Sequence, residues 1–531
     1  MEPLHPWCLY IMILILVLLA LVLLDLHCLR TPPCAPGTRL PPGPWRLPVI
    51  GTLHHLMTVK NPRLVHRALA VLARRWDAPV MYVRLGELHA VVVSSADAAR
   101  EVIRENDTNF ATRTMTATVR ATIGDKVGLV LSPHGAMWRR LRRICTTELL
   151  SARRVRSFRS IREDEAAHLA RAIAMDARSA IAPGERERQL INVSELVSRL
   201  VSDTVLRAIM GERFRWRDEF MATLAKAMTR GAEFSAGDLF PSSKLLRAIN
   251  GTVSESKALN AKLFELVDRA IDQRRGRKAG AAAEDGANDA LLDVLLRLQE
   301  HDDDLDCPLT MATIKAVILD MFGTGTSTTS TTIQWAMLEL MKNPKLMRKV
   351  QQEIRHVLGC KSRVTEDDLT NLKCLKLVIK ETLRLHPGTC VLFPKASQEC
   401  CKILGYDVPK GMLMVMNVWA INRDPKYWDD AEVFKPERFE GTTVDFRGTD
   451  FQFLPFSGGR RMCPGIMLAH ANIELALATL LYHFDWQLPP GVTPDEVDMA
   501  EKFGVDVRPK RDVYLCPVLV SSATENWVVM S

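Results

Sequence analysis

Apolar residues recur at helical spacing along most of this chain, and two short runs near its N-terminal end alternate instead. The helical pattern covers residues 151–298 and a long apolar run at residues 310–342, which Asn343 and Pro344 close. Residues 80–85 and 90–94 alternate with a period of two around a turn signal at Gly86, which predicts two strands. The pattern therefore predicts a largely helical chain that carries a small amount of sheet.

Three segments interrupt this pattern. Residues 106–133 are rich in Thr, Gly and Arg without a clear period, which predicts a long functional loop. Residues 274–286 are polar and low in aromatics, which predicts a flexible loop between helices. Thr365 and Asp368 stand at the spacing of a capping box, with Asp where Glu or Gln is usual, so a short helix is expected to start there.

The N-terminal end predicts a membrane anchor. Residues 7–24 form an uninterrupted apolar run, and a helix of that length spans about 27 Å, close to the hydrocarbon core of a bilayer. A cleaved signal peptide is the alternative, but the run is longer than a usual h-region and no small-residue cleavage site follows it. Arg30, Arg39 and Arg46 follow the run, so the positive-inside rule places the main domain in the cytosol.

Prolines divide the anchor from the rest of the chain. Residues 40–51 hold them at a density that favours stiff, extended backbone. We therefore expect an anchor at residues 1–30, a proline-rich hinge at residues 31–51 and one main domain at residues 52–531.

Composition narrows the class of protein. The 531 residues carry a formal net charge of +8, which we expect to be spread over the surface and the membrane-facing side. No nucleic-acid-binding motif is present, so no nucleic-acid partner is expected. The 12 cysteines have no paired spacing, which argues against a disulfide framework and favours a reducing compartment.

The most specific stretch is a cysteine loop at residues 456–465, which opens onto an apolar helix from Ile466. Cys463 stands just before the helix N-terminus, where unpaired N–H groups and the helix dipole favour a thiolate. Arg460 and Arg461 are expected to add positive charge near the sulfur. A stabilised thiolate can bind iron, and the alternative is a buried structural cysteine in a turn.

Five residues decide between these alternatives: Phe456, Gly459, Arg461, Cys463 and Gly465. Their spacing, Phe-x-x-Gly-x-Arg-x-Cys-x-Gly, resembles the haem-binding signature of the cytochrome P450 superfamily at every fixed position. The resemblance implies that Cys463 is the axial thiolate ligand of a haem iron, which favours O–O cleavage. It also implies a mainly α fold with a small β-rich lobe, the cytochrome P450 fold, here preceded by one transmembrane helix.

The order of motifs is similar to that of plant microsomal A-type members of the family, and especially to grass enzymes that oxidise diterpenes. This similarity implies a single-pass protein of the endoplasmic reticulum membrane, with its catalytic domain facing the cytosol. The proline-rich hinge directly after the anchor resembles the same microsomal members.

The resemblance also implies further haem contacts. Trp138 and Arg142 are i and i+4 on a predicted helix, so they share a face that can hold a haem propionate. Lys395 stands where the family usually has an arginine, and it keeps the charge but loses the bidentate fork. The alternative for the basic helix is a solvated surface. The expected cofactor-contact residues are Trp138, Arg142, Lys395, Phe456, Arg461 and Cys463.

An ion-pair network is expected to hold the cysteine loop. Glu381 and Arg384 are i and i+3 on one helix face, which by itself predicts a weak surface pair. Arg438 lies in a Phe-Lys-Pro-Glu-Arg-Phe stretch that resembles the partner motif of the family. The resemblance implies that the three side chains form one buried Glu-Arg-Arg network.

The centre of the long apolar helix departs from the family pattern. The family has a small residue, Gly, any residue, an acid and Thr, whereas this chain has Thr324, Gly325, Thr326, Ser327 and Thr328. The acid that helps to supply protons for O2 cleavage is therefore missing. Thr328 with water, or a hydroxyl of the substrate, is an alternative proton source. If proton supply limits oxygenation, Ser327→Asp is expected to raise turnover. The many hydroxyl side chains and Gly325 also predict a locally opened helix.

The residues that contact substrate are only weakly indicated. The family covers its substrate with the segment that corresponds to residues 106–133, with an apolar run before Lys395 and with a turn at residues 503–506. The pocket-lining residues expected from this are Met115, Val119, Val127, Val391, Leu392, Phe393 and Val505.

The sequence thus predicts a membrane-anchored haem-thiolate monooxygenase that oxidises an apolar plant secondary metabolite. A terpenoid is the substrate class that the resemblance favours. O2 is its co-substrate, and NADPH-cytochrome P450 reductase supplies the electrons, with cytochrome b5 as a further partner. Thr328, Ser327 and Thr324 are the expected catalytic residues. Two alternatives stay open: a haem-thiolate isomerase or dehydratase that needs no reductase, and a non-catalytic haem scaffold in a membrane complex.

Overall fold

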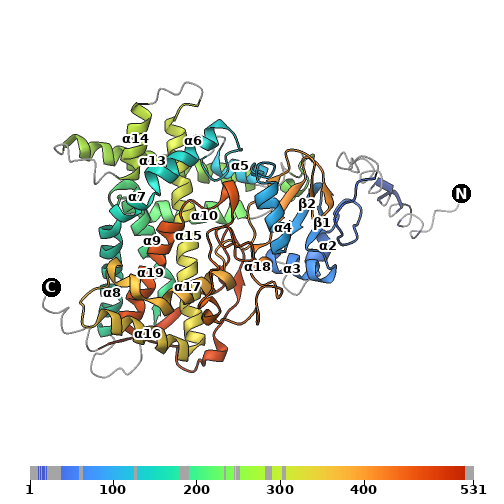
Figure 1. Cartoon of the computed structure of the whole chain (residues 1–531). Coiled ribbons are helices and arrows are strands. Elements are labelled where there is room, and N and C mark those ends of the chain that lie inside the picture. Colours follow the sequence, from blue (N-terminus) through green and yellow to red (C-terminus); the bar gives the residue numbers. More distant parts are fainter. Residues whose placement is uncertain are drawn as a thin grey trace.

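The long apolar helix predicted at residues 310–342 is α15, Met311–Lys342, which runs through the helical part of the molecule (Figure 1). In this computed structural model the hydroxyl of Thr310 accepts a hydrogen bond from the backbone N–H of Thr313 at 3.2 Å and caps the helix. The helix ends at Asn343 because Pro344 begins α16, Pro344–Leu358. The prediction for this element is confirmed.

The structure describes residues 7, 10, 12, 15–17, 19–20, 37–58, 64–124, 128–179, 190–232, 235–243, 246, 252–280, 290–301 and 307–520. Most of the predicted anchor and the first part of the hinge therefore lie outside the described residues. The nine cysteines among the described residues form no disulfide bonds with one another.

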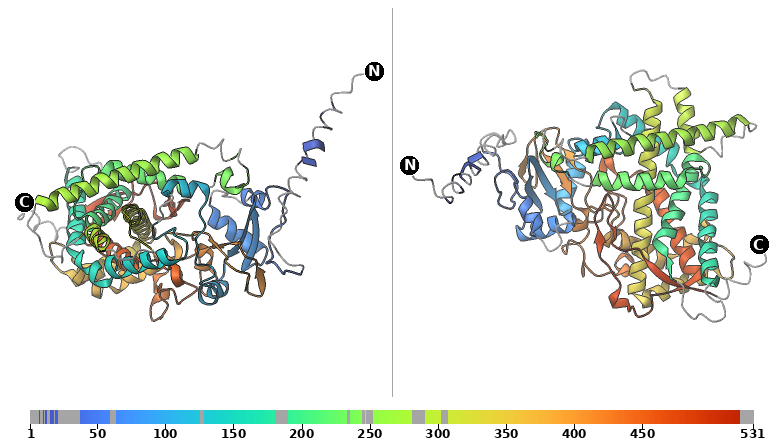
Figure 2. Two further views of the ribbon diagram at one scale, coloured as in Figure 1. Left: turned by 90° about the horizontal axis from the view of Figure 1, so that it is seen from above. Right: turned by 180° about the vertical axis from the view of Figure 1, so that it is seen from behind.

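Helices surround α15 when the molecule is seen from above (Figure 2). Its neighbours include α9, α17 and α19, and their buried side chains form one large apolar cluster with those of α15. The helices of this body, besides α15 and α16, are α7 (Ala152–Ser157), α8 (Arg159–Ser179), α9 (Val193–Met210), α10 (Arg217–Ala232), α11 (Ala236–Leu239), α13 (Thr252–Gly280), α14 (Leu291–Glu300), α17 (Lys373–Leu385) and α19 (Ile466–His483).

The β-rich lobe lies beside this body (Figures 1 and 2). Its main sheet has the order β1-β2-β7-β4, with β2 parallel to β7 and antiparallel pairing elsewhere. The predicted strands are confirmed as β1 (Val80–Leu85) and β2 (Leu88–Val93), joined by a turn in which Gly86 has φ +64°. The remaining strands of this sheet are β7 (Leu413–Met416) and β4 (Lys395–Ala396).

Strand β1 is buried on both faces, because alternate residues enter different apolar clusters. Val80 and Tyr82 pack into one cluster, whereas Met81 and Val83 pack into another with residues of α3 (Val65–Arg75). Short helices complete this side of the molecule: α2 (Leu53–Met57), α4 (Ala96–Arg100), α5 (Ala117–Ile123), α6 (Ala136–Ile144) and α18 (Val418–Ile421). Three further small sheets are β3-β11-β8 (Ile191–Asn192, Tyr514–Leu519, Phe484–Gln487), β5-β6 (Cys401–Ile403, Tyr406–Val408) and β9-β10 (Glu501–Lys502, Arg508–Pro509).

Two loop predictions are wrong over part of their length. The segment at residues 106–133 contains α5, which Thr116 caps by accepting a hydrogen bond from the N–H of Val119. Residues 274–280 belong to α13, where Arg274 pairs with Asp293 at 2.8 Å, and residues 281–286 lie outside the described residues. In both cases contacts with distant residues stabilise helix that local composition does not favour.

The predicted capping box is present. The Thr365 backbone N–H donates to Asp368 Oδ2 at 2.9 Å, and a 3₁₀ helix, Glu366–Asn371, follows. Among the described residues α19 is the one helix long and apolar enough to cross a membrane. Two thirds of it are buried in the protein, so its composition is that of a core helix.

Candidate functional site

An apolar-walled cavity lies between the centre of α15, α6, strand β4 and the loop that precedes α19. Most of the sequence-predicted site residues meet there, although they come from segments far apart in the chain. Those that line the cavity are Trp138, Arg142, Thr324, Thr328, Leu392, Phe393, Lys395, Phe456, Arg461, Cys463 and Val505.

A few predicted residues do not line this cavity. Met115, Val119 and Val391 are partly buried elsewhere, and Val127 lies outside the described residues. Ser327 also faces away from the cavity, because its hydroxyl is used in a contact with Asp506. The loop at residues 106–133 therefore contributes less to the pocket than the sequence predicts.

The cysteine loop has the tight geometry that its glycines predict. Gly459 has φ +67°, and a Cβ at this position would come within 2.5 Å of Asp107 Oδ1, so glycine is required. The Cys463 backbone N–H donates to the Phe456 carbonyl oxygen at 3.0 Å, which closes the loop. Gly465 follows as the N-cap of α19, with its backbone N–H directed at the sulfur.

The charges near the sulfur differ from the expected ones. Arg460 points away to Asp107 and Thr108, and the Arg461 guanidinium donates to the carbonyl oxygens of Ala111 and Ser132. Burial raises the pKa of the Cys463 thiol, and the Gly465 N–H and the charges of Arg142 and Arg113 oppose that rise. The prediction that Arg460 supplies local charge is therefore wrong, whereas Arg461 lines the same cavity as the sulfur.

Four cationic side chains line the cavity together: Arg113, Arg142, Lys395 and Arg461. Burial lowers the pKa values of all four, to about 10 for Arg113, about 9 for Arg461 and about 8 for Lys395, and repulsion from neighbouring cations adds to the lowering for these three. Among the described residues of the wall, Asp320 carries the one carboxyl group, and burial raises its pKa to about 7. This part of the cavity is thus built for an anion.

Comparison with known proteins decides what this arrangement is. The profile of the family described as Cytochrome P450 matches residues 41–516. This chain belongs to the cytochrome P450 family. The protein is accordingly a haem-thiolate monooxygenase, which activates O2 with electrons supplied from outside.

Two relatives of this P450 come from Oryza sativa subsp. japonica. Ent-isokaurene C2/C3-hydroxylase is 43% identical over 514 residues, which cover 96% of this chain and 98% of the relative. Ent-cassadiene hydroxylase is 44% identical over 490 residues, covering 91% and 92%. A solved structure of a zebra fish cytochrome P450 with progesterone has a TM-score of 0.70 at 22% identity, covers 85% of this chain and 99% of that one, and shows the same fold.

The cavity of this P450 fits haem by two independent observations. The Cys463 thiol lines the cavity, and the four cations on its wall carry the positive charge that the two propionates of haem would require. Arg113 Nε is buried without a hydrogen-bond partner, whereas its Nη1 donates to the Val130 carbonyl oxygen at 2.6 Å. An anionic group in the cavity would satisfy this orphan donor.

The distal wall of the P450 is a continuous helix, so the predicted local opening is not present. Five hydroxyl side chains of α15 donate to the carbonyl oxygens four residues earlier: Thr324, Thr326, Thr328, Ser330 and Thr332. Thr328 Oγ1 donates to the Thr324 carbonyl oxygen at 2.7 Å, and Thr324 Oγ1 donates to that of Asp320 at 2.8 Å. The hydroxyls therefore follow the helix rather than break it.

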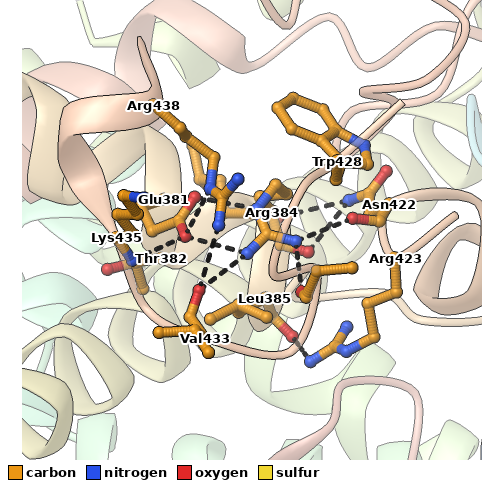
Figure 3. A network of polar contacts seen from close by, with 12 residues as sticks. Glu381, Thr382, Arg384, Leu385, Asn422, Arg423, Trp428, Val433, Lys435 and Arg438 are labelled. Atoms are coloured by element: carbon orange, nitrogen blue, oxygen red, sulfur yellow. Dashed lines mark hydrogen bonds and ion pairs between the residues drawn. The ribbon is translucent and has the colours of Figure 1, made fainter. Parts of the chain in front are cut away.

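The predicted Glu-Arg-Arg network is present and buried (Figure 3). Arg384 Nε and Nη2 donate to the two carboxylate oxygens of Glu381, each at 2.8 Å, and Arg438 Nε donates to Glu381 Oε1 at 3.0 Å. Further donors of Arg384 bind the carbonyl oxygens of Asn422 and Ala431 at 3.0 and 2.7 Å. One helix thereby holds the segment at residues 422–438.

This network reaches the cysteine loop through two further bonds. Asn422 Oδ1 accepts a hydrogen bond from the Leu454 backbone N–H at 3.2 Å, and Trp428 Nε1 donates to the Gln452 carbonyl oxygen at 3.2 Å. Leu454 and Gln452 both lie within four residues before Phe456. The network thus anchors the start of the cysteine loop and not the sulfur itself.

Sequence reasoning missed two site residues, Arg113 and Asp506. Arg113 stands in an irregular stretch with no periodic signal, although a lone arginine among threonines was the available hint. Asp506 is the last residue of the turn at residues 503–506, which the sequence predicts to contact substrate. Its pairing with Ser327, 179 residues away, is a property of the fold alone.

Proposed function

We propose that this P450 hydroxylates a terpenoid, and that a diterpene hydrocarbon is the substrate to test first. The observation that carries the proposal is one shared cavity, where the Cys463 thiol faces Thr328 of α15 and the apolar side chains of Leu392, Phe393 and Val505. An apolar wall suits a hydrocarbon that has few groups to hydrogen-bond. The names of the rice relatives, an ent-isokaurene hydroxylase and an ent-cassadiene hydroxylase, support the same class.

The chain's residues have the following roles in this proposal. Haem, when bound, would supply the chemistry of O2 activation, and the Cys463 sulfur would bind its iron. Trp138, Arg142, Lys395 and Arg461, joined by Arg113, would hold its propionates, and Phe456 would shield the sulfur from water. Thr328 and Thr324 present hydroxyl groups at the distal wall, where a proton donor is required.

We also propose that residues 7–24 anchor the protein in the endoplasmic reticulum membrane, with the catalytic domain in the cytosol. The described apolar side chains of this run, including Trp7, Tyr10 and Leu16, are exposed, as an anchor requires. NADPH-cytochrome P450 reductase is the expected electron donor, and cytochrome b5 a second partner. Alkaline extraction of membranes from cells that express the full chain and a version lacking residues 1–30 tests the anchor.

The isomerase or dehydratase alternative loses its main support in the structure. It depended on Ser327 and Thr324, and above all on the neutral hydroxyl of Ser327 where the family has an acid. Ser327 is hydrogen-bonded to the carboxylate of Asp506, so an acid does stand beside this position. The reductase-dependent reaction is therefore the one that the residues favour.

Microsomes that contain the full chain and a reductase test the proposed function. We expect hydroxylated products from at least one diterpene hydrocarbon, formed only with NADPH and O2. Sesquiterpenes and aromatic amino-acid derivatives serve as comparison substrates. Product without reductase, or turnover of the aromatic compounds alone, would contradict the proposal.

Arg113→Ala is expected to weaken haem binding. Hydrogen bonds to charged groups contribute about 1.5 to 3 kcal/mol, so haem should leave the variant about 10 to 100 times faster. Transfer of haem to an apomyoglobin acceptor measures this rate. Arg139→Ala is the matched control, because Arg139 lies on the exposed side of α6 and should leave the rate unchanged.

A further inference from the structure

A carboxylate from the C-terminal part of the chain lies against the distal helix. Ser327 Oγ donates a hydrogen bond to Asp506 Oδ2 at 2.8 Å, and Thr331 Oγ1 donates to the same oxygen at 2.7 Å. Ser327 and Thr331 are i and i+4, so they share one face of α15. Asp506 thus lies beside Ser327, the helix position at which the family has an acid and this sequence does not.

Neighbouring contacts hold the turn that carries Asp506. Trp335 Nε1 of α15 donates to the Val507 carbonyl oxygen at 2.9 Å. The Val507 backbone N–H in turn donates to the Gly388 carbonyl oxygen at 3.1 Å. On its other side, Val505 lines the cavity. The carboxylate is therefore fixed between the cavity wall and α15.

The Asp506 carboxylate meets hydroxyl groups rather than cations. Within the described part of the chain no Lys, Arg or His forms an ion pair with it, and its contacts to α15 are hydroxyl groups. The residue is also partly exposed, which connects it to solvent. A carboxylate with a purely structural role is more often paired with a cation when it is removed from water.

We propose that the Asp506 carboxylate, acting through Ser327, is the acid of the proton relay that serves the distal side of the haem. Hydroxylation with O2 consumes protons, because the second oxygen atom leaves as water. Ser327 Oγ passes a proton toward the cavity beside Thr328 through one water and takes a proton from Asp506, which takes one from solvent. Ser327 and Asp506 thereby return to their starting protonation states. The reductase supplies the electrons. Asp506 is a positioning residue for Ser327, and the inference rests on the monooxygenase activity described above.

The proposal reverses the effect expected for Ser327→Asp. A carboxylate at residue 327 would meet the Asp506 carboxylate at hydrogen-bond distance, and two like charges there repel each other. The single variant is therefore expected to gain nothing. In an Asp506→Asn background the same substitution restores one carboxylate to the relay.

The test measures how much product forms per NADPH consumed, how much hydrogen peroxide escapes, and the solvent deuterium isotope effect on product formation. General acid groups contribute about 10² to 10⁴-fold, and because water partly replaces them we expect about a tenfold loss of product per NADPH in Asp506→Asn and Ser327→Ala. Peroxide and the isotope effect should rise in both. The double variant Ser327→Asp/Asp506→Asn should recover most of the loss.

Thr331→Val is the matched control, because it removes a hydrogen bond to the same oxygen without touching Ser327. We expect it to keep product per NADPH within about twofold of the unchanged protein. If Thr331→Val and Ser327→Ala are equally harmful, Asp506 only holds the turn in place and the proposal is overturned. An unchanged isotope effect in Asp506→Asn, or no recovery in the double variant, overturns it as well.

The measurements separate this inference from the substrate class. NADPH consumption and peroxide are followed with any ligand that shifts the haem spin state, and the same shift shows that each variant still binds it. A wrong substrate class would appear as missing product in the unchanged protein. If the relay proposal is wrong, the unchanged protein still forms product, but Ser327→Ala and Asp506→Asn do not differ from Thr331→Val in product per NADPH or in peroxide.

Discussion

Cys463→Ala is expected to abolish the thiolate-type Soret band of the reduced, CO-bound protein and to lower hydroxylation below detection. The loop from Phe456 to Gly465 directs this side chain into the cavity, and Cys145 is the one other cysteine of the described residues that lines it. The remaining cations still attract the haem propionates, so loss of the thiolate does not require loss of haem. The spectrum, rather than haem content, is therefore the decisive measurement.

Cys145→Ser is the matched control for this experiment. Cys145 also lines the cavity, but burial raises the pKa of its thiol to about 12, so it stays protonated at neutral pH. The control should keep the Soret band in place. A normal band in Cys463→Ala, or its loss in Cys145→Ser alone, would show that the wrong sulfur has been assigned.

Glu381→Gln is expected to lower the free energy of unfolding by about 3 to 5 kcal/mol, the usual cost of breaking a buried ion pair. Glu381 and Arg384 are fully buried, and the substitution leaves the guanidinium groups of Arg384 and Arg438 without their carboxylate. Loss of the Soret band during urea unfolding of the haem-bound protein measures the change.

The surface pair of Glu437 with Lys349, 3.6 Å apart, provides the comparison. Both side chains are about half exposed, so Glu437→Gln should cost no more than about 1 kcal/mol. Equal effects of the two substitutions would mean that the buried network contributes no more than a surface pair. A large effect of Glu381→Gln on stability with normal turnover at low temperature would place the network in folding alone.

Local pattern predicted the elements whose signals are local. The end of α15 at Asn343 and the strands β1 and β2 follow from periodicity and from proline and glycine chemistry. Spacing within one helix also placed Glu381 beside Arg384. The identity of the cavity depended on a motif, because five residues at fixed intervals are more specific than any propensity.

The missed features all depend on contacts between distant segments. The short helix α5 forms where Asp238 accepts hydrogen bonds from the backbone and hydroxyl of Thr118, and no local signal reveals that partner. The direction of the Arg460 side chain was unpredictable for the same reason, since Asp107 attracts it from far along the chain. Charge counted along a sequence does not show which way a long side chain turns.

The four cations of the cavity have a consequence for how the protein matures. Until porphyrin arrives, their repulsion is unrelieved, because Lys395 remains largely protonated at neutral pH and its three arginine neighbours are protonated throughout. In the newly made chain this region should therefore stay loosely packed until an anionic ligand binds between the cations. Cofactor insertion and the last stage of folding would then be a single event, and haem supply would limit how much of the chain survives cellular quality control.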